Sequence, residues 1–151
     1  MEKIKLKLSE VYGLNAELKG IINQQTGEII QKGILDENLS IKTKYSLSKV
    51  STQLVKEIES VEKLREEIIK KYGDVDKDNK YFIPQRINEV IDEETKQVVS
   101  FDINPKFIQF QTEFESLLQE EVEIDYTPIL LDQIDIKSEI NPSILFKLIT
   151  E

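Results

Sequence analysis

The acidic stretch "YGDVDKDNKYFIP" contains the residues whose types and spacing come closest to a metal site. Asp74, Asp76 and Asp78 alternate as the first three ligands of a calcium-binding loop do. Counting from Asp74, however, the position that needs a bidentate glutamate is occupied by Gln85. We therefore predict a solvated turn between a helix and a strand, closed by local hydrogen bonds of Asp and Asn side chains, and no metal or other cofactor. A weak, adventitious cation site is the alternative.

A second group of carboxylates follows at Glu120 and in the segment "EVEIDY". Alternation places Glu121, Glu123 and Asp125 on one face of a predicted strand. Three carboxylates could hold Mg²⁺, or carry out acid–base chemistry if the pKa of one were raised. No pocket and no partner group elsewhere in the sequence accompany them. We expect a solvent-facing strand, with a charged partner surface as the first alternative and catalysis as the second.

The chain contains neither histidine nor cysteine. This composition excludes disulfides, cysteine nucleophiles, Ser-His-Asp triads and zinc sites built from these ligands. No Walker loop, G-x-G-x-x-G or G-x-S-x-G motif occurs either. We therefore predict that the protein is not an enzyme, and a carboxylate-based enzyme remains the only catalytic alternative.

The net charge of −9 is unevenly distributed along the chain. Residues 1–72 carry 13 basic and 11 acidic side chains, whereas residues 73–151 carry 7 and 18. The acidic half disfavours nucleic-acid binding and could favour a basic partner. No apolar run approaches the roughly 18 residues of a membrane span. The expected protein is therefore soluble and intracellular, with no membrane and no nucleic-acid partner.

A long helix over residues 43–72 is the strongest structural signal, because apolar residues recur there every three or four positions without Gly or Pro. About 30 residues make a rod of roughly 45 Å, which is long for a domain of this size. Part of its apolar stripe is therefore expected to contact a partner helix of this chain or of another copy. The candidate interaction surface comprises this stripe and the acidic group: Leu47, Val50, Leu54, Ile58, Val61, Leu64, Ile68, Glu120, Glu121, Glu123 and Asp125.

Shorter elements are predicted on both sides of this helix. Strict alternation in "KIKLKLS" indicates a half-buried strand, after which Ser9 is expected to cap a helix that includes Ile21 and Ile22. Two Asn-Pro pairs, at Asn104 and Asn141, predict the starts of two further helices. A hairpin is expected around residues 26–40, strands at 80–84, 96–103 and 121–126, and a turn-like segment at 88–97.

Together these elements predict an α+β fold. Its parts are a long antiparallel, coiled-coil-like helical hairpin, a small and mostly antiparallel sheet on which the hairpin packs, and two further short helices. Residues 1–151 are expected to form a single domain from which the helix 43–72 protrudes as an arm.

The order of these motifs resembles that of small, mostly uncharacterised phage and prophage proteins with a long central helix that ends in a KKYG-type turn. The resemblance is carried by a "K-x-x-Y-x-L-x-K" start of the long helix, an "E-x-x-R-x-x-x-x-K-K-Y-G" end, a later acidic helix and strand, a "P-x-x-L" segment and a short terminal helix. The matching residues are Lys42, Tyr45, Leu47, Lys49, Glu62, Arg65, Lys70, Lys71, Tyr72, Gly73, Glu120 to Ile124, Pro128 and Pro142 to Ile149.

This resemblance implies a helper or minor structural component of phage particles, and it transfers no catalytic residue. The function we expect is therefore a non-enzymatic one, exercised through contacts with a protein partner: another copy of the chain, a phage protein or a host protein. The chain would act as an assembly factor or minor virion component, in the host cytoplasm, in the virion or in both. An acidic inhibitor of a host nucleic-acid-binding or defence protein is the alternative.

Overall fold

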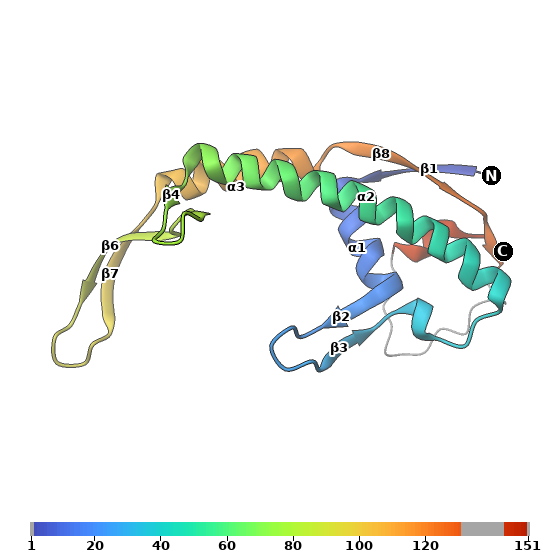
Figure 1. Cartoon of the computed structure of the whole chain (residues 1–151), viewed down its shortest axis with the longest axis horizontal. Coiled ribbons are helices and arrows are strands. Elements are labelled where there is room, and N and C mark those ends of the chain that lie inside the picture. The colour runs from blue at the N-terminus through green and yellow to red at the C-terminus, as the bar shows by residue number, and fades with distance from the viewer. Residues whose placement is uncertain (1, 131–143, 151) are drawn as a thin grey trace. The chain divides into compact units, whose positions relative to one another are not determined.

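The structure, a computed structural model, describes residues 2–130 and 144–150. About 48% of these residues are helical and about 28% lie in strands, which confirms the predicted α+β class. The three α-helices are α1 (Leu8–Lys19), α2 (Ile41–Tyr72) and α3 (Pro105–Leu118) (Figure 1). The described strands form five two-stranded sheets, four of them antiparallel, where a single small and mostly antiparallel sheet was expected.

The chain packs as two compact units. The first unit contains the residues up to Ser60 and those from Gln119 onward, and the second contains Val61–Leu118. The first unit holds β1 (Glu2–Lys7), α1, β2 (Gly20–Ile22), β3 (Ile29–Lys32), η1 (Ile34–Asp36), the first part of α2, β8 (Glu121–Tyr126), β9 (Ile129–Leu130), η3 (Leu145–Leu148) and β10 (Ile149–Thr150). The second unit holds the last part of α2, β4 (Asp74–Val75), β5 (Tyr81–Phe82), β6 (Arg86–Ile91), β7 (Val98–Ile103) and α3.

The strand β1 passes directly into the helix α1. The predicted cap at Ser9 is wrong, because the helix begins at Leu8 and Lys7 is the capping residue. The backbone N–H of Lys7 donates to the Glu10 carboxylate at 3.1 Å, which satisfies a donor that the end of the strand leaves unpaired. The helix ends before Gly20, whose φ of 82° lies in the left-handed region. Ile21 and Ile22 therefore lie in β2, not in the helix.

The core of the first unit is made by side chains from α1, α2, the β1–β8 pair and the C-terminal segment. Each of these side chains is at least 95% buried, and burying an aliphatic side chain of this size contributes about 1.5–3 kcal/mol. The core residues are Leu6, Leu8, Val11, Leu14, Leu18, Ile34, Leu47, Val50, Leu54, Ile124, Ile129, Leu145 and Leu148.

The helix α2 confirms the prediction for residues 43–72 and begins two residues earlier, at Ile41. The Ser40 hydroxyl accepts a hydrogen bond from the backbone N–H of Thr43 at 3.2 Å, as a capping serine does. After the helix ends, the N–H of Gly73 donates to the carbonyl oxygen of Ile69 at 2.6 Å. A Cβ atom at Gly73 would lie 2.6 Å from the carbonyl oxygen of Phe82, so the glycine is required for close backbone packing.

In the second unit, Asn104 confirms its predicted role at the start of α3. Its side-chain oxygen accepts from the N–H of Lys106 at 3.1 Å, and its amide nitrogen donates to the carbonyl oxygen of Pro84 at 2.8 Å. The strand boundaries differ from the prediction. The segment 88–97, expected to be turn-like, contributes its first residues to β6, which pairs antiparallel with β7.

The C-terminal segment also differs from the prediction. The expected cap at Asn141 and start at Pro142 lie outside the described residues. Leu145 and Leu148 are buried as expected, but they belong to a short 3-10 turn, in which the N–H of Lys147 donates to the carbonyl oxygen of Ile144.

Candidate interaction surfaces

The predicted apolar stripe of α2 divides into a buried and an accessible part. Leu47, Val50, Leu54 and Val61 are at most 2% exposed, so they are core residues and offer no surface to a partner. Ile58 and Ile68 are half-buried, whereas Leu64 is 42% exposed. In the second unit, Leu64 and Ile68 are thus the members of the stripe that another molecule could reach.

Leu64 and Ile68 line an open pocket of about 430 Å³ within the second unit. Across the pocket, the Lys71 ammonium contacts the Glu113 carboxylate at 3.0 Å. Hydrogen bonding by Tyr72 and Lys71 holds the pKa of Glu113 below its usual value, and hydrogen bonding to Glu113 raises the pKa of Lys71. The pocket is therefore an apolar patch bordered by a fixed ion pair. Its lining consists of Leu64, Glu67, Ile68, Lys71, Glu113 and Leu117.

The strand β1 lies beside β8 (Figure 1), and its lysines stand opposite the acidic residues of β8 in the register. The antiparallel register pairs Lys5 with Glu123, and the Lys3 ammonium lies 3.8 Å from the Glu123 carboxylate. Opposite charges on neighbouring strands stabilise a pair modestly. The three carboxylates are thus largely compensated within the chain, and they do not form a strongly negative surface. The opposed pairs are Lys3 with Asp125, Lys5 with Glu123, and Lys7 with Glu121, while Glu120 is exposed just before the strand.

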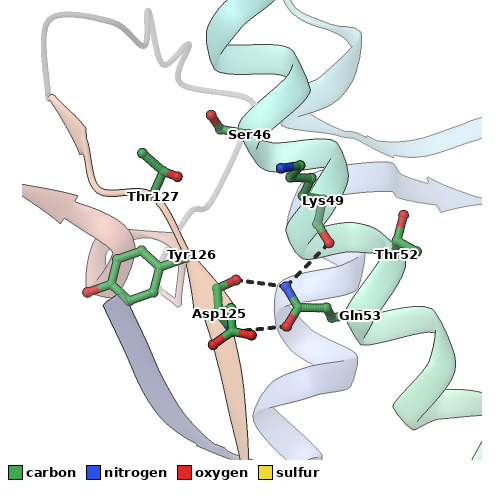
Figure 2. A pocket seen from close by; sticks show the side chains of 7 residues that line it. All are labelled: Ser46, Lys49, Thr52, Gln53, Asp125, Tyr126 and Thr127. Carbon is green, nitrogen blue, oxygen red and sulfur yellow. Dashed lines mark hydrogen bonds between the residues drawn. The ribbon is translucent and has the colours of Figure 1, made fainter. Parts of the chain in front are cut away.

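A pocket of about 290 Å³ lies between α2 and β8 in the first unit (Figure 2). Its centre is the side-chain amide of Gln53, which forms hydrogen bonds to both the N–H and the carbonyl oxygen of Asp125. Because the nitrogen and the oxygen of this amide are both already hydrogen-bonded to the backbone of Asp125, the Gln53 side chain has a structural role in the pocket. Its lining consists of Ser46, Lys49, Thr52, Gln53, Asp125, Tyr126 and Thr127.

The acidic turn after α2 is a tight β-hairpin between β4 and β5. The Asp76 carboxylate accepts hydrogen bonds from the backbone N–H groups of Asp78 and Lys80, at 2.8 and 2.9 Å. Asn79 adopts a left-handed φ of 60°. The prediction of a turn closed by a local Asp side chain is therefore confirmed, and Asn79 contributes its backbone conformation. Among the described residues, no three potential metal-ligating side chains cluster together.

An exposed apolar surface on the β6–β7 hairpin was missed by the sequence analysis. The β6–β7 hairpin exposes six large apolar side chains, each by 40% or more, although Val98, Val99 and Phe101 were expected to be partly buried. The alternation of apolar Val99, Phe101 and Ile103 with polar Ser100 and Asp102 is that of a half-buried strand, so nothing in the sequence signals this exposure. The six side chains are Val90, Ile91, Val98, Val99, Phe101 and Ile103.

In comparisons with protein-family models, curated proteins and solved structures, no match was found. Within residues 2–130 and 144–150, no helix has the length and apolar character needed to cross a membrane.

Proposed function

We propose that the protein acts through contacts with other proteins and that the β6–β7 hairpin is its principal contact surface. The observation that carries this proposal is the exposure of Val90, Ile91, Val98, Val99, Phe101 and Ile103 on a single two-stranded hairpin. Large apolar side chains exposed together on one element are uncommon on a monomer and mark an interaction site.

The energetics of the hairpin also support a binding role. A two-stranded hairpin with water on both sides is at best marginally stable by itself. Among the described residues, no third strand pairs with β6 or β7. A partner that covers the hairpin would stabilise its strands and bury its apolar side chains at about 25 cal/mol per Å².

The kind of process that we propose is assembly: the protein is an assembly factor or minor virion component of a phage, present in the host cytoplasm, in the virion or in both. Support comes from the resemblance of the segment from Lys42 to Gly73 to the KKYG-type phage proteins. We also propose that the last turns of α2 and the helix α3 act together as an antiparallel helical hairpin. The Lys71–Glu113 ion pair and the stacking of Arg65 over Phe110, at 5.9 Å, support that arrangement.

The alternative functions receive less support. An acidic inhibitor needs an uncompensated negative face, and the pairing of Lys5 with Glu123 in the β1–β8 sheet reduces the field of that face. A carboxylate enzyme needs a carboxyl group placed in a pocket beside a reacting group. Glu123, the centre of the acidic face, is instead a half-exposed side chain beside Lys3.

Co-purification with phage particles tests the proposal. A tagged chain is expressed during infection, and particles and assembly intermediates are separated on a density gradient. The wild-type chain is expected in particle or intermediate fractions, and Phe101→Ser/Ile103→Ser is expected to be lost from them. The matched control is Ile41→Ser, which removes an apolar side chain that is 89% exposed on α2, outside the hairpin. Absence of the wild-type chain from every fraction would contradict an assembly role.

A salt series separates this proposal from the inhibitor alternative. Association through apolar side chains should persist when the ionic strength is raised, whereas binding by an acidic mimic should weaken steeply.

A further inference from the structure

The β6–β7 hairpin has one face that is more apolar than the other near its base. Arg86 pairs with Ile103 across the two strands, so these two side chains share a face. Phe101 lies two residues before Ile103, and the Arg86 guanidinium stacks over its ring at 4.3 Å. On the opposite face, the amide of Asn88 donates to the Asp102 carboxylate at 3.0 Å. The Phe101–Ile103 side is therefore the face suited to apolar packing.

The two ends of the same hairpin carry opposite charges. The tip, residues 92–97, contains three acidic side chains and one lysine, which gives a net charge of −2. The base carries the positive charges of Arg86 and Lys106 and the negative charge of Asp102, so the base is net positive. In the described part of the chain, neither Arg86 nor Lys106 has an ion-pair partner, and the same holds for Glu93 and Glu94.

We propose that this face binds the same face of a second copy, with the two hairpins antiparallel about a two-fold axis, so that each acidic tip lies beside the partner's basic base. This inference rests on the proposed function, because it names a second copy of the chain as the partner of the hairpin. The six-residue strands are about 20 Å long, so antiparallel packing separates the two acidic tips by more than the screening length of about 8–10 Å. A parallel arrangement would instead place like charges together.

The two-fold symmetry would also supply the packing that a two-stranded hairpin lacks by itself. In a two-fold dimer the same patch on both copies is covered at once. Phe101 and Ile103 of each copy would lose their contact with water, and each hairpin would gain a second layer of packing. Because the contact would involve one face of a two-stranded hairpin, we expect a weak dimer, with a dissociation constant on the order of 10 μM.

Sedimentation over a concentration series measures the association directly. The wild-type chain is expected to pass from monomer to dimer, and Phe101→Ser/Ile103→Ser is expected to weaken the dimer at least about tenfold, which is about 1.4 kcal/mol. Ile41→Ser, with its exposed side chain on α2, serves as the control and should dimerise like the wild type. A wild-type chain that stays monomeric well above that concentration would overturn the inference.

Charge reversal tests the orientation with variants of exposed side chains, of which Arg86→Glu also removes the stacking over Phe101. Glu93→Lys/Glu94→Lys should weaken the dimer by repulsion between each tip and the partner's base. Adding Arg86→Glu/Lys106→Glu to the same chain should restore complementarity and recover most of the lost affinity. Failure of this second pair of substitutions to recover any affinity would contradict the antiparallel arrangement.

Cross-linking gives a second, independent measure of orientation, because the chain contains no native cysteine. Mixed Glu93→Cys and Lys106→Cys chains should form a tip-to-base disulfide faster than Glu93→Cys chains link to one another. Equal rates, or a faster tip-to-tip link, would overturn the proposal.

The outcomes distinguish failure of this inference from failure of the proposed function. A monomeric chain that still enters phage particles through Phe101 and Ile103 would show that the face binds another protein, so the inference would fall and the function would stand. A dimer that never enters particles would leave the inference standing and remove the assembly role.

Discussion

The side-chain amide of Gln53 pairs with the backbone of Asp125 as a neighbouring strand would. Its nitrogen donates to the carbonyl oxygen of Asp125 at 2.7 Å, and its oxygen accepts from the N–H of Asp125 at 2.9 Å (Figure 2). The amide thereby connects α2 to β8 within the first unit and satisfies two backbone groups that β1 does not reach.

Replacing this amide should destabilise the first unit. Gln53→Leu removes both bonds and leaves the part-buried N–H and carbonyl groups of Asp125 unsatisfied, so we expect the free energy of unfolding to fall by about 1–3 kcal/mol. Urea denaturation followed by circular dichroism measures the change. Thr52→Ala, which removes only a local bond to the carbonyl oxygen of Ser48, should stay within about 0.5 kcal/mol. A Gln53→Leu change no larger than this control would contradict the structural role of the amide.

The opposition of Lys5 and Glu123 predicts a measurable coupling. Lys5→Glu places like charges directly opposite and should lower the free energy of unfolding by about 0.2–1 kcal/mol. The double variant Lys5→Glu/Glu123→Lys should recover most of the loss because it restores an opposite pair. A double-mutant cycle in low-salt buffer measures the coupling energy, and strict additivity of the two substitutions would show that the pair does not interact.

The buried carboxylate of Glu17 should make stability depend on pH. Glu17 is 4% exposed, and its two oxygens accept from the N–H of Ile144 at 2.9 and 3.2 Å. Burial raises the pKa of Glu17 above its usual value of 4.5, and the backbone hydrogen bonds only partly oppose the shift. A raised pKa in the folded state means that the folded chain holds this proton more tightly. The associated stability is present below pH 4.5 and is lost as the pH rises through the folded-state pKa.

Two substitutions separate this titration from the hydrogen bond itself. Glu17→Gln keeps an acceptor oxygen and does not titrate, so the difference in unfolding free energy between wild type and variant should change with pH above 4.5. Glu17→Ala does not titrate either, so its difference from the wild type should change with pH in parallel, and the lost acceptor of Ile144 should make it about 1–3 kcal/mol less stable than Glu17→Gln. Urea denaturation at a series of pH values provides the comparison, and a pH-independent difference for Glu17→Gln would contradict the raised pKa.

The elements that the sequence predicted correctly share a strong local cause. The helix α2 follows from apolar spacing that only a 3.6-residue period satisfies, and the start of α3 follows from the capping side chain of Asn104 before Pro105. The alternation in β8 likewise predicted that Glu123 faces solvent, and Ile124 on the other face is buried.

The features that the sequence analysis missed depend on contacts between distant segments. Which lysine faces Glu123 depends on the register of β1 against β8, more than 100 residues apart. The burial of Leu54 and the exposure of Leu64 depend on what packs against each part of α2, although both residues occupy the same periodic pattern. Periodicity identifies the apolar stripe, but it does not indicate which segments pack against each part of it.

Gly73 illustrates the same limit, because its position after a helix indicates one reason for a glycine and the structure shows another. A glycine after a helix indicates a left-handed C-terminal residue, yet Gly73 is not among the described residues with positive φ. The requirement comes from the backbone of Ile69 and Phe82, whose carbonyl oxygens would lie 2.5 and 2.6 Å from a Cβ atom.

Substitution at Gly73 distinguishes the two causes. Gly73→Ala and Gly73→Asn should both destabilise the second unit by about 1–3 kcal/mol, since either side chain collides with backbone that has little room to move. A left-handed position would tolerate asparagine much better than alanine. Urea denaturation of both variants provides the measurement, and a mild effect of Gly73→Asn beside a large effect of Gly73→Ala would contradict the packing explanation.

The final prediction separates the two parts of the α2 stripe. Leu54 is fully buried, so Leu54→Glu places an unpaired charge in the core and should lower the free energy of unfolding by more than about 3 kcal/mol. Leu64 is 42% exposed, so Leu64→Glu should change stability by only about 0.5 kcal/mol. Urea denaturation measures both effects. If Leu54→Glu retained wild-type stability and instead lost self-association, the buried half of the stripe would have to be an interface between chains.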